Sequence, residues 1–87
     1  MAYRLEIVRN AQKQMLALPA TAQKEIAPAI DSLSNDPRPA GCKKLRVNGL
    51  WRIRIGQYRA VYGIDDKTRL VTVLKVAVRR EDTYQGL

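Results

Sequence analysis

Residues 50–64 constrain the fold of this chain more than any other stretch. From residue 50 to residue 55 apolar side chains alternate with two arginines, which is the period-two pattern of a strand with one apolar and one charged face. Gly56 and Gln57 follow, and a glycine at the first loop position supplies the positive φ angle of a two-residue type II′ turn. Residues 58–64 form the return strand. The stretch therefore predicts a β-hairpin with two chemically different faces.

The two-residue loop also predicts the pairing of the hairpin. Counting outward from the loop places Arg54 opposite Arg59, and Arg52 lies two residues along on the same face. Like charges directly opposite each other destabilise a sheet by up to ~1 kcal/mol. Three clustered guanidiniums suit a phosphate ligand, whereas the plainer alternative is a charged strand that only faces solvent. The remaining predicted pairs are Ile55–Tyr58, Ile53–Ala60 and Arg52–Val61.

The N-terminal third of the chain predicts one strand and two helices. Residues 2–8 alternate apolar and charged side chains. A first helix follows, with Asn10 as its N-cap and its end at Pro19, and a second helix covers 20–35. Pro28 inside the second helix predicts a kink there or a later start. The apolar stripes are Val8, Ala11, Met15 and Leu18 on the first helix and Ile26, Ala29, Ile30 and Leu33 on the second.

The C-terminal part predicts an interior strand. A turn at 65–68 leads into 70–78, which is almost continuously apolar and β-branched, as expected of a strand covered on both faces. The order β-α-α-β-β-β predicts an α+β fold, a small and mainly antiparallel sheet with the two-helix hairpin packed on one face. Because 87 residues are too few for two cores, we expect a single domain over 1–87.

Composition limits the chemistry. The chain holds 16 Lys and Arg against 8 Asp and Glu, a net charge of +8, so we expect an acidic partner. It has no histidine and one cysteine, Cys42, which excludes a zinc cluster, a Ser-His-Asp triad and a Cys-His dyad built from its own side chains. We expect no cofactor. The absence of a long apolar run predicts a cytoplasmic chain without a membrane span.

The aromatic residues separate into two groups. Trp51, Tyr58 and Tyr62 fall on the apolar face of the hairpin and are expected to pack in the core. Tyr84 follows the last predicted strand in a polar tail, where it is available for base stacking or for proton transfer. Arg79 also follows that strand, and its face depends on whether the preceding turn uses three or four residues.

Two segments resemble a known family. The runs Gly-Leu-Trp-Arg-Ile-Arg-Ile-Gly-Gln-Tyr-Arg-Ala-Val-Tyr at 49–62 and Val-Ala-Val-Arg-Arg-Glu-Asp-Thr-Tyr at 76–84 are similar to the RelE branch of the RelE/ParE toxin superfamily. The resemblance implies a metal-independent endoribonuclease that enters the ribosomal A site, cuts messenger RNA and halts translation. It also implies a cognate RelB-like antitoxin that wraps and neutralises the toxin in a hetero-oligomer.

The resemblance further implies roles for individual residues. Arg52 and Arg54 take positions where some members use lysines as base and phosphate contact. Because an arginine stays protonated it is a poor general base, and Glu81 and Asp82 are further candidates for proton transfer, although solvated charges of the tail are the favoured interpretation of both. Arg59 corresponds to the residue that holds the scissile phosphate, Arg79 to a second charge-stabilising arginine, and Tyr84 to the tyrosine that stacks on the base or assists proton transfer. Further RNA contacts are expected at Lys43, Lys44, Arg46 and Arg80.

Two other functions are compatible with the same fold. A ParE-like member would inhibit DNA gyrase without being a nuclease. A non-catalytic RNA-binding module would use the basic surface only for phosphate contacts. The spacing of Arg79 and Tyr84, together with the clustered hairpin arginines, favours the RelE branch.

Overall fold

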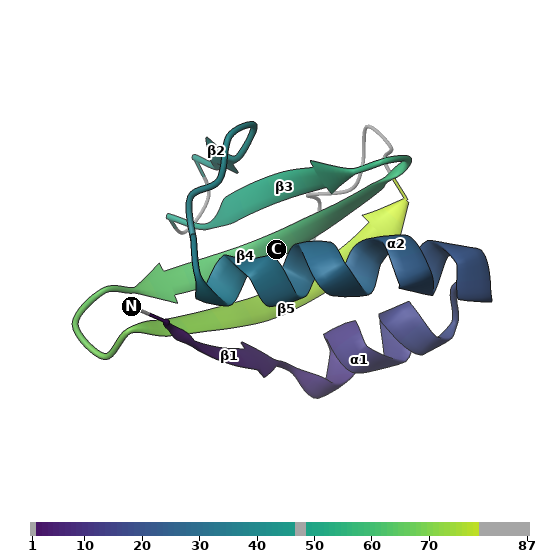
Figure 1. The fold of residues 1–87 in the computed structure, drawn as a ribbon, viewed down its shortest axis with the longest axis horizontal. Coiled ribbons are helices and arrows are strands. Elements are labelled where there is room, and N and C mark those ends of the chain that lie inside the picture. The colour runs from purple at the N-terminus through teal and green to yellow at the C-terminus, as the bar shows by residue number, and fades with distance from the viewer. Residues whose placement is uncertain (1, 47–48, 79–87) are drawn as a thin grey trace.

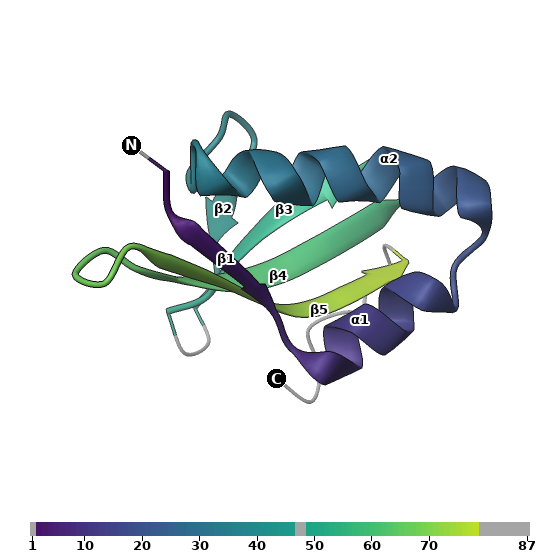
Figure 2. The same cartoon turned by 60° about the horizontal axis from the view of Figure 1, so that its bottom comes forward.

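The computed structural model describes residues 2–46 and 49–78, and over these it is an α+β fold with two helices on one face of a five-stranded sheet (Figures 1 and 2). This confirms the predicted fold class. In chain order the elements are β1 (Arg4–Ile7), α1 (Arg9–Leu16), α2 (Ala20–Asp31), the 3₁₀ helix η1 (Ser32–Ser34), β2 (Lys43–Lys44), β3 (Trp51–Ile55), β4 (Tyr58–Asp65) and β5 (Leu70–Val78).

The sheet has the strand order β1-β5-β4-β3-β2, in which β1 runs parallel to β5 and the other neighbours are antiparallel. Strand β5 lies between β1 and β4, which confirms its predicted interior place. Strand β2 is not among the predicted elements, because two residues are too few to show a periodic pattern. The β3–β4 register matches the prediction at every pair from Arg52–Val61 to Ile55–Tyr58. Gly56 has a φ angle of +58°, as a turn that begins with glycine requires.

The helix boundaries differ from the predicted ones at the start of α1, at its end, which is Leu16 and not Pro19, and at the end of α2, whereas the start of α2 agrees. Helix α1 begins at Arg9 with Val8 as its N-cap, so the expected cap at Asn10 is wrong: the extended backbone of Val8 continues β1 directly into the helix. Helix α2 begins at Ala20 and runs through Pro28, which excludes the later start. Its α-helical part ends at Asp31, and η1 replaces the last predicted turn.

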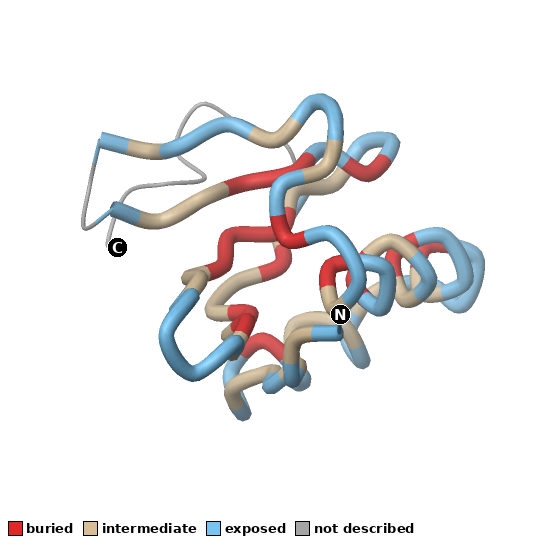
Figure 3. The backbone as a smooth tube through the Cα atoms, turned by 60° about the vertical axis from the view of Figure 1, so that its left-hand side comes forward, coloured by how far each residue is buried: buried red, intermediate tan, exposed pale blue. Residues whose placement is uncertain are grey.

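The core lies between the helices and the sheet (Figure 3). Both predicted apolar stripes face it, with Ala11 and Ile26 fully buried. Tyr62 is also fully buried, and Trp51 and Tyr58 pack against the core as partly buried residues, as expected. Among the described residues, no helix combines the length and apolar character needed to cross a membrane.

Strand β5 contains a β-bulge. Val61 pairs with Lys75 while Tyr62 pairs with Val73, so Leu74 is an extra residue on β5. Val71 and Val73 before the bulge and Val76 after it are buried against the helices, but the residues between them are half-buried. The expectation of full cover on both faces is therefore wrong: the helices cover only one face of this strand.

Candidate functional site: a basic sheet face

The sheet surface opposite the helices carries Arg52, Arg54 and Arg59, and we call it the arginine face. Arg54 and Arg59 are directly opposite each other on β3 and β4. They form a non-hydrogen-bonded pair, because the two-residue turn makes Ile55–Tyr58 the hydrogen-bonded pair and the types alternate along the ladder. Side chains approach most closely in such pairs. The register therefore concentrates positive charge at this point of the sheet.

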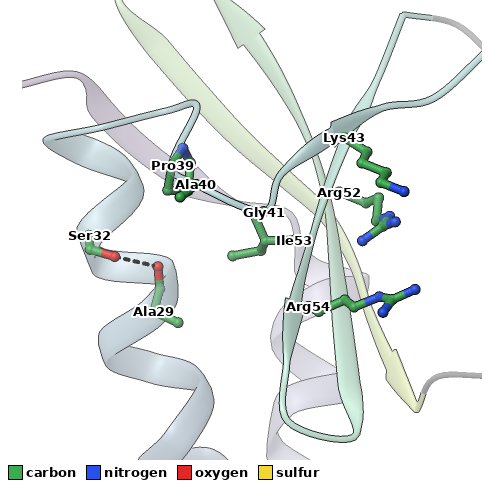
Figure 4. A pocket seen from close by; sticks show the side chains of 9 residues that line it. All are labelled: Ala29, Ser32, Pro39, Ala40, Gly41, Lys43, Arg52, Ile53 and Arg54. Carbon is green, nitrogen blue, oxygen red and sulfur yellow. Dashed lines mark hydrogen bonds between the residues drawn. The ribbon is translucent and has the colours of Figure 1, made fainter.

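Arg52 is buried, which the sequence does not predict for an arginine on this face. Only 6% of its surface is exposed, and its cross-strand neighbours are Lys43 on β2 and the fully buried Val61 on β4. Figure 4 shows Lys43, Arg52 and Arg54 pointing to the same side, away from α2, whereas Ile53 points toward α2. Within 2–46 and 49–78, no carboxylate forms an ion pair with Arg52 or Arg54. A buried guanidinium with no ion-pair partner in these ranges favours an anionic ligand.

Lys75 joins this surface and is a residue that sequence reasoning missed. The bulge at Leu74 sets it opposite Val61, in the cross-strand row that also contains Lys43 and Arg52. The adjacent row contains Arg54, Arg59 and Ala77. Strands are about 4.8 Å apart, so these two rows bring basic side chains from four strands within reach of one short stretch of phosphate backbone.

The other predicted RNA contacts are placed differently. Lys44 pairs with Trp51, whose side chain packs toward the core, so Lys44 does not share the arginine face. Arg46 is exposed just beyond β2. Arg79, Arg80 and Tyr84, together with Glu81 and Asp82, lie outside the described residues.

The loop before β2 is anchored at three points, and it sets where β2 and Lys43 lie. The Tyr62 hydroxyl donates a hydrogen bond of 2.7 Å to the carbonyl oxygen of Pro37, and burial raises the pKa of this phenol. Arg38 lies over the ring of Trp51, 5.1 Å from its centroid, and forms an ion pair of 2.8 Å with Asp66. These contacts tie the loop to β3, to β4 and to the β4–β5 turn.

Asp66 is the centre of a small polar network. It accepts hydrogen bonds from Arg38 and, at 2.6 Å, from the hydroxyl of Tyr3. The bond from Arg38, followed by that from Tyr3, holds the pKa of the Asp66 carboxyl below its usual value. The same carboxylate raises the pKa of the Tyr3 phenol. Among the residues of known placement, no three histidine, cysteine or carboxylate side chains gather in a way that could hold a metal ion.

Comparison with known proteins identifies the family. Residues 5–83 match the family model described as the ParE toxin of type II toxin–antitoxin systems, parDE. The chain belongs to the RelE/ParE toxin superfamily. It is thus a toxin of the type II class, and the predicted resemblance is confirmed at that level.

Individual RelE/ParE relatives agree over nearly the whole chain. A Methanocaldococcus jannaschii protein named toxin RelE1 is 28% identical over 99% of both sequences. The RelE–RelB complex of Pyrococcus horikoshii OT3 gives a TM-score of 0.82 at 29% identity, covering 93% of this chain and 99% of that one. The isolated Escherichia coli RelE toxin gives 0.76 at 26% identity, covering 95% and 92%.

Proposed function

We propose that this toxin is a ribosome-dependent, metal-independent endoribonuclease that cuts messenger RNA in the A site. The observation that carries the proposal is the arginine face, where Arg52 is buried without an ion pair to a described carboxylate and Arg54 lies opposite Arg59. A fixed cluster of guanidiniums is suited to a phosphate that gains negative charge during reaction. The similarity to RelE toxins supports the same activity.

The proposed reaction needs no group beyond the RNA and the protein. The ribose 2′-oxygen attacks the adjacent phosphorus as its proton passes to a base, for which Tyr84, Glu81 and Asp82 are the candidates, and the bond from phosphorus to the 5′-oxygen breaks. The products are a 2′,3′-cyclic phosphate and a 5′-hydroxyl, which takes up a proton. Arg59 and Arg54 would hold the phosphate oxygens through the transition state. In-line positioning of the nucleotide by the ribosome would lower part of the activation barrier, so a weak base would suffice.

A second candidate, inhibition of DNA gyrase, is favoured by the match to the ParE family model. Against it stands the similarity at 26–29% identity to solved RelE toxins. Inducing expression of the chain separates the two: the ribonuclease predicts that protein synthesis stops first, whereas a gyrase inhibitor predicts that DNA supercoiling changes while synthesis continues.

Mapping messenger ends tests the ribonuclease directly. The purified chain is added to translating ribosomes that carry a defined message, and new 5′-hydroxyl ends are expected within the A-site codon. Arg59→Ala should lower the cleavage rate by about 10²–10³-fold, as loss of one charge-stabilising donor does in other enzymes. Arg9→Ala is the matched control, because it removes the same charge from an exposed position on α1. Intact message despite ribosome binding would support a non-catalytic RNA-binding module instead.

We propose that a RelB-like antitoxin neutralises this chain in a hetero-oligomer. The supporting observations are the net charge of +8 and the likeness to chains solved in RelE–RelB complexes from Pyrococcus horikoshii and Mycobacterium tuberculosis. An acidic segment over the arginine face would exclude RNA by occupying the same side chains.

A further inference from the structure

The outer edge of β3 loses its strand partner partway along its length. Leu45 donates its backbone N–H to the carbonyl of Leu50, and Lys43 pairs with Arg52, so backbone groups at even-numbered positions of β3 point away from β4. Arg54 is the next such residue, and β2 does not extend to it. Within the described ranges, its backbone N–H and C=O have no strand partner at this edge.

The segment just before β2 turns away from the edge of β3, so it does not fill the position that a longer β2 would occupy. The residue opposite Arg54 would be Gly41, but Gly41 has a φ angle of +90°, and Cys42 donates its N–H back to the carbonyl of Pro39. This turn carries the backbone off the edge. Beside the edge it leaves a groove of about 440 Å³, shown in Figure 4, between the end of α2 and β3. The groove is lined by Ala29, Ser32, Pro39, Ala40, Gly41, Lys43, Arg52, Ile53 and Arg54.

The two sides of the groove differ in chemistry. Ala29 and Ile53 make the side toward α2 apolar, and Lys43 and Arg54 make the other side basic. A strand laid along β3 would direct alternate side chains to these two sides. Its apolar residues would pack beside Ile53, and the residues between them would meet the cations. The groove therefore matches a sequence in which apolar residues alternate with Asp or Glu.

We propose that this groove docks an extended acidic segment of a protein partner, which adds a short strand to β3 at Arg54. The inference rests on the proposed function in one respect, since the neutralising antitoxin is the partner expected to supply the segment. A peptide backbone offers the donor and acceptor that the Arg54 edge requires, and an RNA phosphate offers no donor. A second copy of this chain is a poor occupant, because each copy carries a net charge of +8.

The test uses the whole protein and a synthetic peptide with alternating glutamate and valine, seven residues long and capped at both ends. NMR titration follows the backbone amide of Arg54, whose exchange with solvent should slow on binding as it acquires an acceptor. Replacing every glutamate by lysine should weaken binding at least tenfold, because the charges then repel. In the antiparallel arrangement that β2 shows, the glutamates exchange the backbone hydrogen bonds with the Arg54 edge. Replacing the central glutamate by proline should therefore weaken binding about tenfold more than replacing it by glutamine, because only the proline removes a strand hydrogen bond.

Two tryptophan variants locate the site. Ser32 is exposed and lines the groove, so Ser32→Trp should fill the groove and weaken binding at least tenfold. Thr21 is exposed at the opposite end of α2, so Thr21→Trp should bind the peptide as the wild type does. Equal binding by Ser32→Trp, indifference to the proline, or an oligouridylate that protects the Arg54 amide and is blocked by Ser32→Trp would each overturn the proposal.

The outcome is independent of the ribonuclease assay, because the titration contains no ribosome. If the chain binds the peptide as described but leaves message intact, the proposed ribonuclease function is wrong and the proposed docking site stands. A chain that cuts message but does not bind the peptide would overturn the docking site alone.

Discussion

At the scale of single residues, the burial of Arg52 is the most informative feature. An ionised group withdrawn from water costs free energy unless an opposite charge compensates it, and Arg52 is only 6% exposed with no ion pair to a described carboxylate. Its neighbours Lys43 and Arg54 add repulsion to the cost of desolvation. A phosphate bound at the arginine face would relieve both terms, so this arrangement favours binding over the stability of the free chain.

This predicts opposite effects of Arg52→Met on stability and on function. The free energy of unfolding should rise by about 1 kcal/mol, since a buried charge is replaced by an apolar chain of similar length. Cleavage of ribosome-bound message should fall at least tenfold. Urea unfolding and messenger-end mapping measure the two quantities. Arg54→Met is the control for stability: Arg54 is exposed, so its change should stay below about 0.5 kcal/mol. A marked loss of stability in Arg52→Met would show that the guanidinium supports the fold.

At the scale of elements, the β3–β4 turn lies close to helix α2 at Gly56 and Glu25. A β-carbon added at Gly56 would overlap the carboxylate of Glu25, and the φ angle of Gly56 is +58°. Gly49 has a similar φ angle of +66° but open space around the same position. The two glycines therefore separate the cost of the backbone conformation from the cost of the contact with α2.

Gly56→Ala should destabilise the protein more than Gly49→Ala. Each substitution places alanine in the left-handed region, at a cost of about 1–2 kcal/mol. Only the first displaces the carboxylate of Glu25, the free end of an exposed side chain, and we expect it to lose at most about 0.5 kcal/mol more. Chemical unfolding of both variants checks the difference. Equal losses would mean that the turn does not rely on its contact with α2.

The Arg38–Asp66 ion pair predicts a pH dependence of the loop before β2. The hydrogen bonds from Arg38 and Tyr3 hold the folded pKa of Asp66 below its ordinary value of 3.8, so its contribution to stability is present above that value and is lost as the pH falls through the folded pKa. Both partners are substantially exposed, so the effect should be small. Urea titrations at neutral pH and near pH 3 compare the wild type with Asp66→Asn, whose stability should change less over this interval. Equal losses of stability in the wild type and in Asp66→Asn would mean that the ion pair does not contribute to the pH dependence.

The elements also show what the sequence could predict and why the rest was hidden. The β3–β4 register was predictable because a two-residue loop fixes every pair by counting. The face of Lys75 was not, because it depends on one extra residue at Leu74. One signal was available: Lys75 is in phase with the buried Val71 and Val73, and Val76 is out of phase, which indicates a bulge. The burial of Arg52 depends on contacts between strands far apart in sequence and has no local signal.

At the scale of the whole molecule, the charge is unevenly distributed over the two layers. Of the described cations, Lys43, Arg52, Arg54, Arg59 and Lys75 lie on neighbouring positions of the sheet face opposite the helices. The two helices carry three cations, Arg9, Lys13 and Lys24, against two acidic residues, Glu25 and Asp31. An approaching polyanion is therefore attracted more strongly to this sheet face than to the helices. Under the proposed function this surface would bind both RNA and an acidic antitoxin segment, and their binding would be mutually exclusive.

Association with ribosomes should consequently weaken steeply with salt. Each phosphate contact to single-stranded RNA contributes about −0.7 to the slope of log affinity against log salt concentration, so contacts from all five cations predict a slope of about −3.5. Affinity should then fall about 10²-fold between about 50 and 200 mM monovalent salt. Sedimentation of the chain with ribosomes at several salt concentrations gives the slope. Arg54→Ala should reduce its magnitude by about 0.7, because one contact is removed, and Arg9→Ala on the helical layer should leave it unchanged. A slope near zero, or equal changes in both variants, would mean that the arginine face is not the surface that meets RNA.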